Sequence, residues 1–419
     1  MSDIEVKGTV ASEFDPVRRR LAELAGDLGQ GGGAFSVYLE GEAVVDLWAG
    51  WARPGQPWVE DTLTVVASAT KGMAALCVQI LVDRGELDPD APVGKYWPEY
   101  ATNGKEDTLV RHVLIHTAGL IGTPELTNII HWDGDGEDWR DLDAITQTLA
   151  AAPPQWAPGT KHGYHAITFG WLVGEIVRRV SGMTLGQFYA KEVAGPLGLD
   201  TYIGTPISEH HRVAQTLGFD ATGRPPEAVM MMEFSKAMAA NPNTMTGLAF
   251  VANGTVSPLD CAAALSVTPG WLQAEIPASN ATTTARSLAK PYALLSLGGT
   301  LNGVRLLSPE AVALFDHEVS AAPDALFAEL DIPGAEALLN ALVHRTLGYF
   351  QSSPQPGQLP AFGPSPRAYG AEGLGGQVAF CDPEHKVAAG FIRSEMDLTP
   401  AISNELVRVF YECLLGSAG

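Results

Sequence analysis

The pattern of apolar positions changes twice near the start of the chain. Apolar residues recur at helical spacing across residues 14–28 and stop at three consecutive glycines. Residues 35–39 and 43–48 form two apolar runs, and the Glu-Gly-Glu between them predicts a tight turn that joins two strands. After a short extended run, apolar residues stand at positions i, i+3, i+4, i+7 and i+8 from Met73. This spacing predicts a buried helix that ends at Gly85.

Helical patterns dominate the middle of the chain, and strand patterns return near its end. Apolar stripes at helical spacing alternate with long loops in the middle, and the clearest stripes lie at 110–115 and 172–180. The last part of the chain predicts a helix, then strands around turns with one hairpin loop, then a final helix. These elements are expected at 283–297 (helix), 301–307, 375–380 and 387–392 (strands), 382–386 (hairpin loop) and 400–414 (helix).

Strands therefore occur at both ends of the chain, and helices fill the middle. We predict a mixed α/β (α+β) fold, in which an antiparallel sheet flanked by helices is built from both termini. Residues 1–87 and 281–419 would form a discontinuous α/β domain, and residues 88–280 an inserted, mostly helical domain. A chain of 419 residues is long enough for two such units, and we expect the active site at their interface.

Composition and charge exclude several classes of protein. Hydrophobic residues make up 46% of the chain and charged residues 18%, which is typical of a globular protein rather than a disordered one. The net charge of −22 repels phosphate backbones, so we expect no nucleic-acid partner. No apolar run approaches the roughly 18–20 residues that span a bilayer, and the first residues lack a basic and apolar leader, so we expect neither a membrane segment nor a signal peptide.

The cysteines indicate a reducing compartment. Cys77, Cys261, Cys381 and Cys413 are far apart, lie in apolar contexts and form no C-x-x-C pair. This arrangement predicts buried free thiols rather than disulfides. Together with the absence of a leader, it predicts a cytoplasmic protein.

Ser68 and Lys71 carry the most informative chemistry of the sequence. They stand three residues apart at the predicted start of a helix, and this spacing places both side chains on one face, with Cβ atoms about 5–6 Å apart. A serine hydroxyl becomes a nucleophile when a base lies within hydrogen-bond reach and donors await the developing oxyanion. A lysine that loses solvation has a lowered pKa and can act as that base. Tyr164, just ahead of another predicted helix, offers a phenol that can take the proton if Lys71 and its surroundings stabilise the phenolate.

The S-x-x-K spacing is a weak signal by itself, because the chain contains it twice. Ser287 and Lys290 repeat it inside a predicted helix, just before Pro291, with no strand leading into them. There we favour a serine on the helix surface and a solvated lysine. Ser68 differs because it follows a strand and a turn, at a helix start where free backbone N–H groups and a positive potential are available.

Several motifs in order along the chain resemble the serine β-lactamase-like superfamily, which has the fold of class C β-lactamases and penicillin-binding proteins. The similarity is greatest to the family VIII carboxylesterases and runs from about residue 35 to residue 395. S-x-x-K is one of the marks of this superfamily. The motifs lie at 66–72 (VASATKG), 110–120 (VRHVLIHTAGL), 158–174 (PGTKHGYHAITFGWLVG), 283–286 (TTAR), 307–310 (LSPE) and 373–377 (GLGGQ).

The resemblance implies a role for each matching residue. Ser68 would be the nucleophile and Lys71 its proton partner. Tyr164, in the place of the family's Tyr-x-Asn tyrosine, would be the general base and later the acid. The backbone N–H groups of Ser68 and Leu374 would form the oxyanion hole, because Leu374 follows the glycine that ends the third motif of the family.

Two motifs depart from the pattern of β-lactamases. The middle motif reads Tyr-His-Ala, so Ala166 replaces the asparagine that binds the substrate amide in lactamases. The third motif, Ala371-Glu372-Gly373, stands where lactamases have Lys-Thr-Gly, so the cation that grips a β-lactam carboxylate is absent. These four residues are the substrate-binding candidates. Glu372 either points into the site, where it would favour a cationic or amine-bearing substrate, or faces solvent from its strand.

Metal and cofactor chemistry is not expected. His112 and His116 stand four residues apart on a helical stretch, a spacing that can bind a metal, but the glutamate of an H-E-x-x-H motif is missing. We interpret both as structural histidines. No P-loop, G-x-G-x-x-G or G-x-S-x-G motif occurs, which argues against nucleotide-binding and α/β-hydrolase classes.

The sequence therefore predicts a serine carboxylesterase that acts on a small-molecule ester through an acyl-enzyme. Three alternatives remain open for the same site: an amide hydrolase of the 6-aminohexanoate-oligomer or D-peptide type, an acyltransferase, and a weak β-lactamase. A binding protein that has kept the fold without the activity is a fourth. The natural substrate and the oligomeric state do not follow from the sequence.

Overall fold

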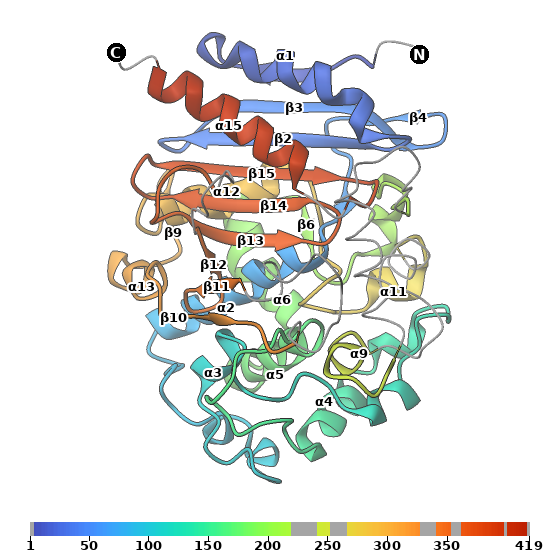
Figure 1. The fold of residues 1–419 in the computed structure, drawn as a ribbon, viewed down its shortest axis with the longest axis vertical. Coiled ribbons are helices and arrows are strands. Elements are labelled where there is room, and N and C mark those ends of the chain that lie inside the picture. The colour runs from blue at the N-terminus through green and yellow to red at the C-terminus, as the bar shows by residue number, and fades with distance from the viewer. Residues whose placement is uncertain are drawn as a thin grey trace.

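One large antiparallel sheet organises the protein. The computed structural model describes residues 4–218, 241–251, 266–326, 341–352, 362–397 and 400–416. Strands from the two ends of the chain lie side by side in this sheet (Figure 1). In spatial order the strands are β1 (Lys7–Val10), β3 (Glu42–Arg53), β2 (Gly32–Leu39), β15 (Val387–Arg393), β14 (Gln377–Asp382), β13 (Tyr369–Gly373), β12 (Phe350–Gln351), β11 (Leu342–Arg345) and β10 (Ser320–Pro323), with β4 (Gln56–Pro57) paired to β3.

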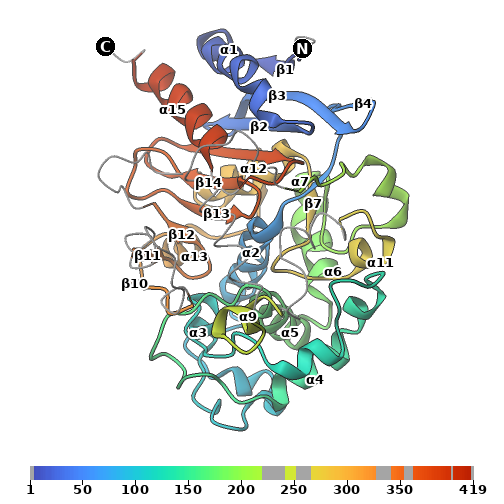
Figure 2. The same cartoon turned by 45° about the vertical axis from the view of Figure 1, so that its right-hand side comes forward.

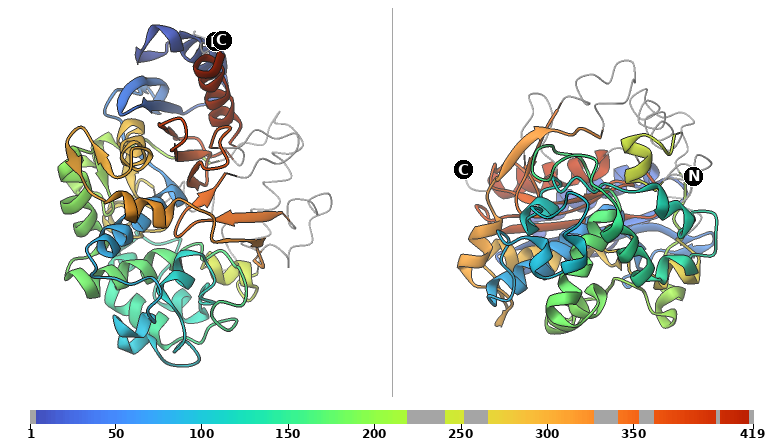
Figure 3. Two further views of the ribbon diagram at one scale, coloured as in Figure 1. Left: turned by 90° about the vertical axis from the view of Figure 1, so that its left-hand side faces the viewer. Right: turned by 90° about the horizontal axis from the view of Figure 1, so that it is seen from below.

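Alternating side chains give the central strands two apolar faces. Phe35 of β2 and Phe391 of β15 point to one face, which helices α1 (Asp15–Leu24) and α15 (Ala401–Gly416) cover. Ile392 of β15 points to the other face, against which α12 (Ala285–Ser296) packs. In Figure 1, α1 and α15 lie in front of the sheet and α12 behind it, and Figure 3 shows α1 and α15 together at one end of the molecule. The sheet is therefore buried on both faces.

Helix α2 (Thr70–Asp83) joins the sheet to the helices from the middle of the chain. It is buried along nearly its whole length and packs against α5 (Thr168–Ser181) and α6 (Leu185–Tyr189) as well as against β13 and α13 (Pro309–Phe315). Figure 2 shows α2 between the sheet and these helices. Shorter elements complete the described fold: α3 (Val110–Leu114), α4 (Leu142–Ala151), α7 (Gly195–Leu197), α9 (Met245–Ala249), α11 (Pro269–Gln273), a small sheet of β5 (Thr64–Val65), β7 (Thr282–Thr283) and β6 (Thr201–Tyr202), and a hairpin of β8 (Thr300–Leu301) and β9 (Val304–Arg305).

The predicted fold class is confirmed: an antiparallel sheet built from both ends of the chain is flanked by helices. The stretch 301–307 folds as the β8–β9 hairpin, because Asn302 and Gly303 both adopt positive φ and reverse the chain. Strands β1 and β10 to β12 were not predicted, because each has only two to four residues. The domain boundaries near residues 87 and 281 stay a prediction.

The structure shows the state of three of the four cysteines and the length of the helices. Cys77 and Cys381 are free and buried as predicted, and Cys413 is free but half-buried. Cys261 lies outside the described residues. Within the described ranges, every helix is too short or too polar to cross a lipid bilayer.

Candidate active site

Ser68 lies in a tight 3-10 turn, Ala67–Ala69, that leads from strand β5 into helix α2. The residue before it, Ala67, has a φ of 44°, in the left-handed region that non-glycine residues rarely occupy. Strain of this kind persists only where the surroundings fix the backbone, and it is common at functional sites. Ser68 borders a cavity of about 300 Å³. The serine therefore stands in the turn just before the helix that the sequence predicts.

Lys71 is held against Ser68 by the carbonyl groups around it. Its Nζ lies 3.1 Å from Ser68 Oγ and donates to the carbonyls of Ala166 at 2.7 Å and Ala278 at 2.9 Å. A neutral amine has two N–H bonds and one lone pair. With both N–H bonds used by the carbonyls, the lone pair is available to accept the Ser68 proton. Burial, together with the positive charge of Arg345, holds the pKa of Lys71 well below its usual range and favours this neutral form.

Tyr164 completes the group that the sequence singles out. It lies in the loop before α5, and Lys71 Nζ is 4.8 Å from the centre of its ring. Burial raises the pKa of Tyr164 to about 12, while the Ser68 hydroxyl and the positive charge of Arg345 act to lower it. His116 packs beside the tyrosine, with ring centres 4.9 Å apart. The three predicted residues therefore converge on one point, and the phenol is protonated at neutral pH.

Two residues behind Tyr164 were missed by the sequence analysis. Asp324 Oδ1 accepts the backbone N–H of Tyr164 at 3.0 Å, and Asp324 Oδ2 accepts from Arg345 Nη2 at 2.9 Å. Both side chains are almost fully buried. Arg345 ends strand β11, and the only signal in the sequence is a single basic residue in an apolar run. The pair fixes the loop that carries Tyr164 and places a positive charge beside it.

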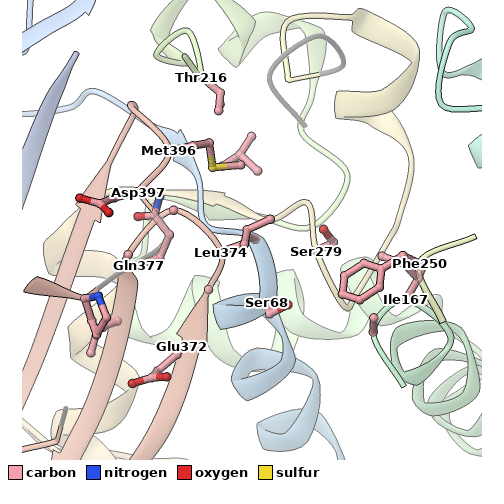
Figure 4. Close-up of a pocket in the computed structure, with 18 of the residues that line it drawn as sticks. Ser68, Ile167, Thr216, Phe250, Ser279, Glu372, Leu374, Gln377, Met396 and Asp397 are labelled. Carbon is pink, nitrogen blue, oxygen red and sulfur yellow. The ribbon is translucent and has the colours of Figure 1, made fainter. Parts of the chain in front are cut away.

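The backbone around Leu374 lies where the resemblance places the oxyanion hole. Leu374 follows β13 and borders the same cavity as Ser68 (Figure 4). Among the described residues, nothing accepts a hydrogen bond from the N–H of either residue. Gly373 lets β13 approach the serine turn, because a Cβ at this position would lie 2.3 Å from the carbonyl oxygen of Val66. Two free N–H donors therefore border the cavity that the Ser68 hydroxyl enters.

The substrate-binding candidates divide between the cavity and the core. Ala166, Glu372 and Gly373 line the cavity, whereas Ala371 is buried toward Gly72 of α2 and is not among the described lining residues. Burial raises the pKa of Glu372. In Figure 4, Glu372 and Leu374 lie on the β13 side of the view and Phe250 lies on the opposite side of Ser68. Of the two orientations that the sequence left open for Glu372, the structure has the one that borders the cavity, and the residue is partly exposed there.

The second S-x-x-K copy has a structural role. Ser287 is buried rather than on the helix surface as predicted, and its Oγ accepts the N–H of Asp200 at 2.9 Å. Lys290 Nζ donates to the carbonyl of Leu197 at 2.7 Å. The prediction of a surface serine fails because α12 packs this face between the main sheet and the segment that contains Asp200. Neither side chain is placed to activate the other.

The two histidines of the metal-like spacing serve different backbone groups. His112 Nδ1 accepts the N–H of Leu109 at 3.2 Å, and His116 Nδ1 accepts the N–H of His165 at 3.0 Å. His116 has a positive φ of 61° and lies under Tyr164, and burial holds its pKa well below the usual range. Each ring therefore stabilises local backbone.

Comparisons with known proteins agree with this geometry. A model of the beta-lactamase family matches residues 17–402. The chain is 35% identical over 406 residues to the esterase/beta-lactamase LipL of Mycobacterium tuberculosis. This alignment covers 96% of this chain and 85% of LipL. A crystal structure of a family VIII carboxylesterase superposes with a TM-score of 0.81 at 33% identity, over 98% of this chain and 100% of that one. A penicillin-binding protein homologue from Caulobacter crescentus gives a TM-score of 0.80 at 31% identity, with the same coverage. The chain belongs to the beta-lactamase family.

Proposed function

We propose that the protein is a serine carboxylesterase that hydrolyses small-molecule esters through an acyl-enzyme on Ser68. The observation that carries the proposal is the position of Lys71 Nζ, 3.1 Å from Ser68 Oγ and bonded to two carbonyls. This arrangement supplies a neutral base to a serine that borders a cavity. Relatives that carry esterase in their names support the same reaction.

In the first half of the reaction, Ser68 Oγ attacks the ester carbonyl carbon as Lys71 takes its proton. The carbonyl oxygen becomes an oxyanion, and the N–H groups of Ser68 and Leu374 are placed to stabilise it. Collapse of this intermediate breaks the bond to the alcohol, which leaves with a proton donated through Tyr164. The directions of the two pKa shifts favour this order, with Lys71 as base and Tyr164 as proton donor, over the reverse.

In the second half, water attacks the acyl-enzyme. The same base takes a proton from the water, and Ser68 leaves as the proton returns to its oxygen. The products are the carboxylic acid and the regenerated serine. The chain lacks the cation of the lactamase third motif and has Ala166 in place of an amide side chain, so it offers little to hold a β-lactam. Ester hydrolysis needs only the nucleophile, the base and the oxyanion donors.

The test compares two serine variants on p-nitrophenyl acetate. Ser68→Ala is expected to lower kcat/KM by at least about a thousandfold, because the covalent route is lost. Ser287→Ala is the matched control and is expected to keep near wild-type activity, because Ser287 lies in the core away from the cavity. Activity of Ser68→Ala within tenfold of wild type would overturn the proposal. Parallel assays with a linear amide, a β-lactam and an added alcohol acceptor separate the esterase from the alternative reactions.

A further inference from the structure

Glu372 is a carboxylate on the wall of the catalytic cavity that has no partner among the described residues. It lies on β13 two residues before Leu374, which corresponds to about 7 Å along the strand. Glu372 lines the same cavity as Ser68 and Tyr164. Figure 4 shows Glu372 and Ser68. Among the described residues, none donates a hydrogen bond to this carboxylate or forms an ion pair with it. A carboxylate that loses water without gaining a partner costs free energy unless a ligand supplies one.

The other charged groups around the cavity are not available to pair with Glu372, so a ligand would have to supply the partner. The described lining residues include no lysine, arginine or histidine. The other acidic lining residue, Asp397, accepts a hydrogen bond from Arg393 at 3.0 Å. The nearby cation of Arg345 is used by Asp324, and Lys71 donates to two carbonyls. Among the described residues that line the cavity, Glu372 therefore carries the charge that no other group of the protein compensates.

The rest of the wall also suits a cation. The lining residues include five aromatic side chains, whose faces attract a positive charge. The whole chain has a net charge of −22, which raises the local concentration of cations and lowers that of anions. These observations are independent of Glu372 and favour the same sign of charge in the ligand. The aromatic residues are Trp132, Tyr164, Phe250, Trp271 and Phe350.

We propose that Glu372 forms an ammonium-binding subsite, and that the preferred substrates are esters with a cationic nitrogen a few bonds from the scissile carbonyl. The inference rests on the ester-hydrolase function proposed above and names its substrate class. The nitrogen belongs either to the acyl part or to the alcohol part of the ester, and both offer the same charge to the carboxylate. Charge on the acyl part affects acylation and deacylation, whereas charge on the alcohol part affects acylation alone.

The experiment measures kcat/KM for pairs of esters that differ only in charge. For the acyl part, the p-nitrophenyl ester of aminohexanoate is compared with that of heptanoate, its neutral isostere. For the alcohol part, a choline ester is compared with the corresponding dimethylbutyl ester. Wild type is expected to prefer the cationic member of one pair by about tenfold or more. In Glu372→Gln this ratio falls toward one, and in Glu372→Asp most of it remains.

A control variant separates the subsite from the overall charge of the protein. Glu86→Gln removes one negative charge at the far end of α2, about 20 Å from Ser68, and is expected to keep the wild-type ratio. Melting temperatures of all variants verify folding. The substrate preference of the wild-type enzyme is measured without any substitution, so it does not depend on how a variant folds. Two results would overturn the subsite and leave the esterase function standing. One is a wild-type enzyme that hydrolyses the neutral esters but shows no preference for the cationic ones. The other is a preference ratio that stays the same in Glu372→Gln. Failure to hydrolyse any of the four esters overturns both.

Discussion

The buried ion pair between Arg345 and Asp324 offers a perturbation whose effects on stability and on catalysis can be separated. The two side chains are only 3% and 2% exposed. Arg345→Met keeps most of the side-chain volume but leaves the Asp324 carboxylate buried without its cation. Breaking a buried pair by removing one partner costs about 3–5 kcal/mol. We expect the free energy of unfolding, measured by urea titration, to fall by this amount.

The same replacement changes the proton affinity of Lys71. The positive charge of Arg345 contributes to the lowered pKa of Lys71, so its removal raises that pKa. At a pH below this pKa the amine is protonated and cannot accept the Ser68 proton, and each unit of increase lowers the neutral fraction about tenfold. The acid limb of the pH profile of kcat/KM for p-nitrophenyl acetate is therefore expected to move to higher pH.

A double variant separates the two effects. Arg345→Met with Asp324→Asn removes both charges but keeps the Oδ1 that accepts the N–H groups of Tyr164 and Leu326. Stability is expected to return to within about 2 kcal/mol of wild type, because neither charge of the pair remains buried without its partner. The shifted acid limb is expected to persist. A single variant that unfolds at the wild-type urea concentration would refute the role of the pair in stability. A double variant with the wild-type pH profile would refute the effect of Arg345 on Lys71.

Two further predictions test close packing at the site and a buried cation away from it. In Gly373→Ala the new Cβ would meet the Val66 carbonyl and displace the serine turn, so kcat/KM is expected to fall about a hundredfold. Gly26→Ala is the control, because its Cβ would meet open space, and it is expected to match wild type in the same assay. Lys105 is fully buried and donates to three backbone carbonyls. Lys105→Met is therefore expected to lower the free energy of unfolding by about 3 kcal/mol and to leave catalysis at room temperature unchanged. An unchanged urea midpoint for Lys105→Met would contradict this role.

The parts of the fold that the sequence predicts correctly have strong local patterns. Helix α2 follows from the periodicity after Met73, and strands β14 and β15 follow from two apolar runs around a turn. Strands β10 to β12 have two to four residues each, which is too few for a clear alternating pattern, even though β11 and β12 pair across a short turn. The sheet edge that carries Arg345 was therefore invisible to the sequence analysis.

The site shows the same division between local and distant information. Ser68 and Lys71 share one helical turn, so their spacing alone places them together. Tyr164 was identified by its motif, but its contact with Lys71 depends on how α2 packs against α5. The side of β13 on which Glu372 lies was left open, because strand alternation fixes two faces without telling which one meets the cavity. Asp324 and Arg345 had no motif, and only the fold joins them to Tyr164.

The proposed mechanism requires that the substrate acyl group is transferred to Ser68. Mass spectrometry of the intact chain after brief mixing with an activated ester, followed by peptide mapping, tests it most directly. A mass increase equal to the acyl group is expected on the peptide that contains Ser68, and no such increase is expected in Ser68→Ala. An ester that is turned over with no adduct on Ser68, or with the adduct on Ser287, would contradict it.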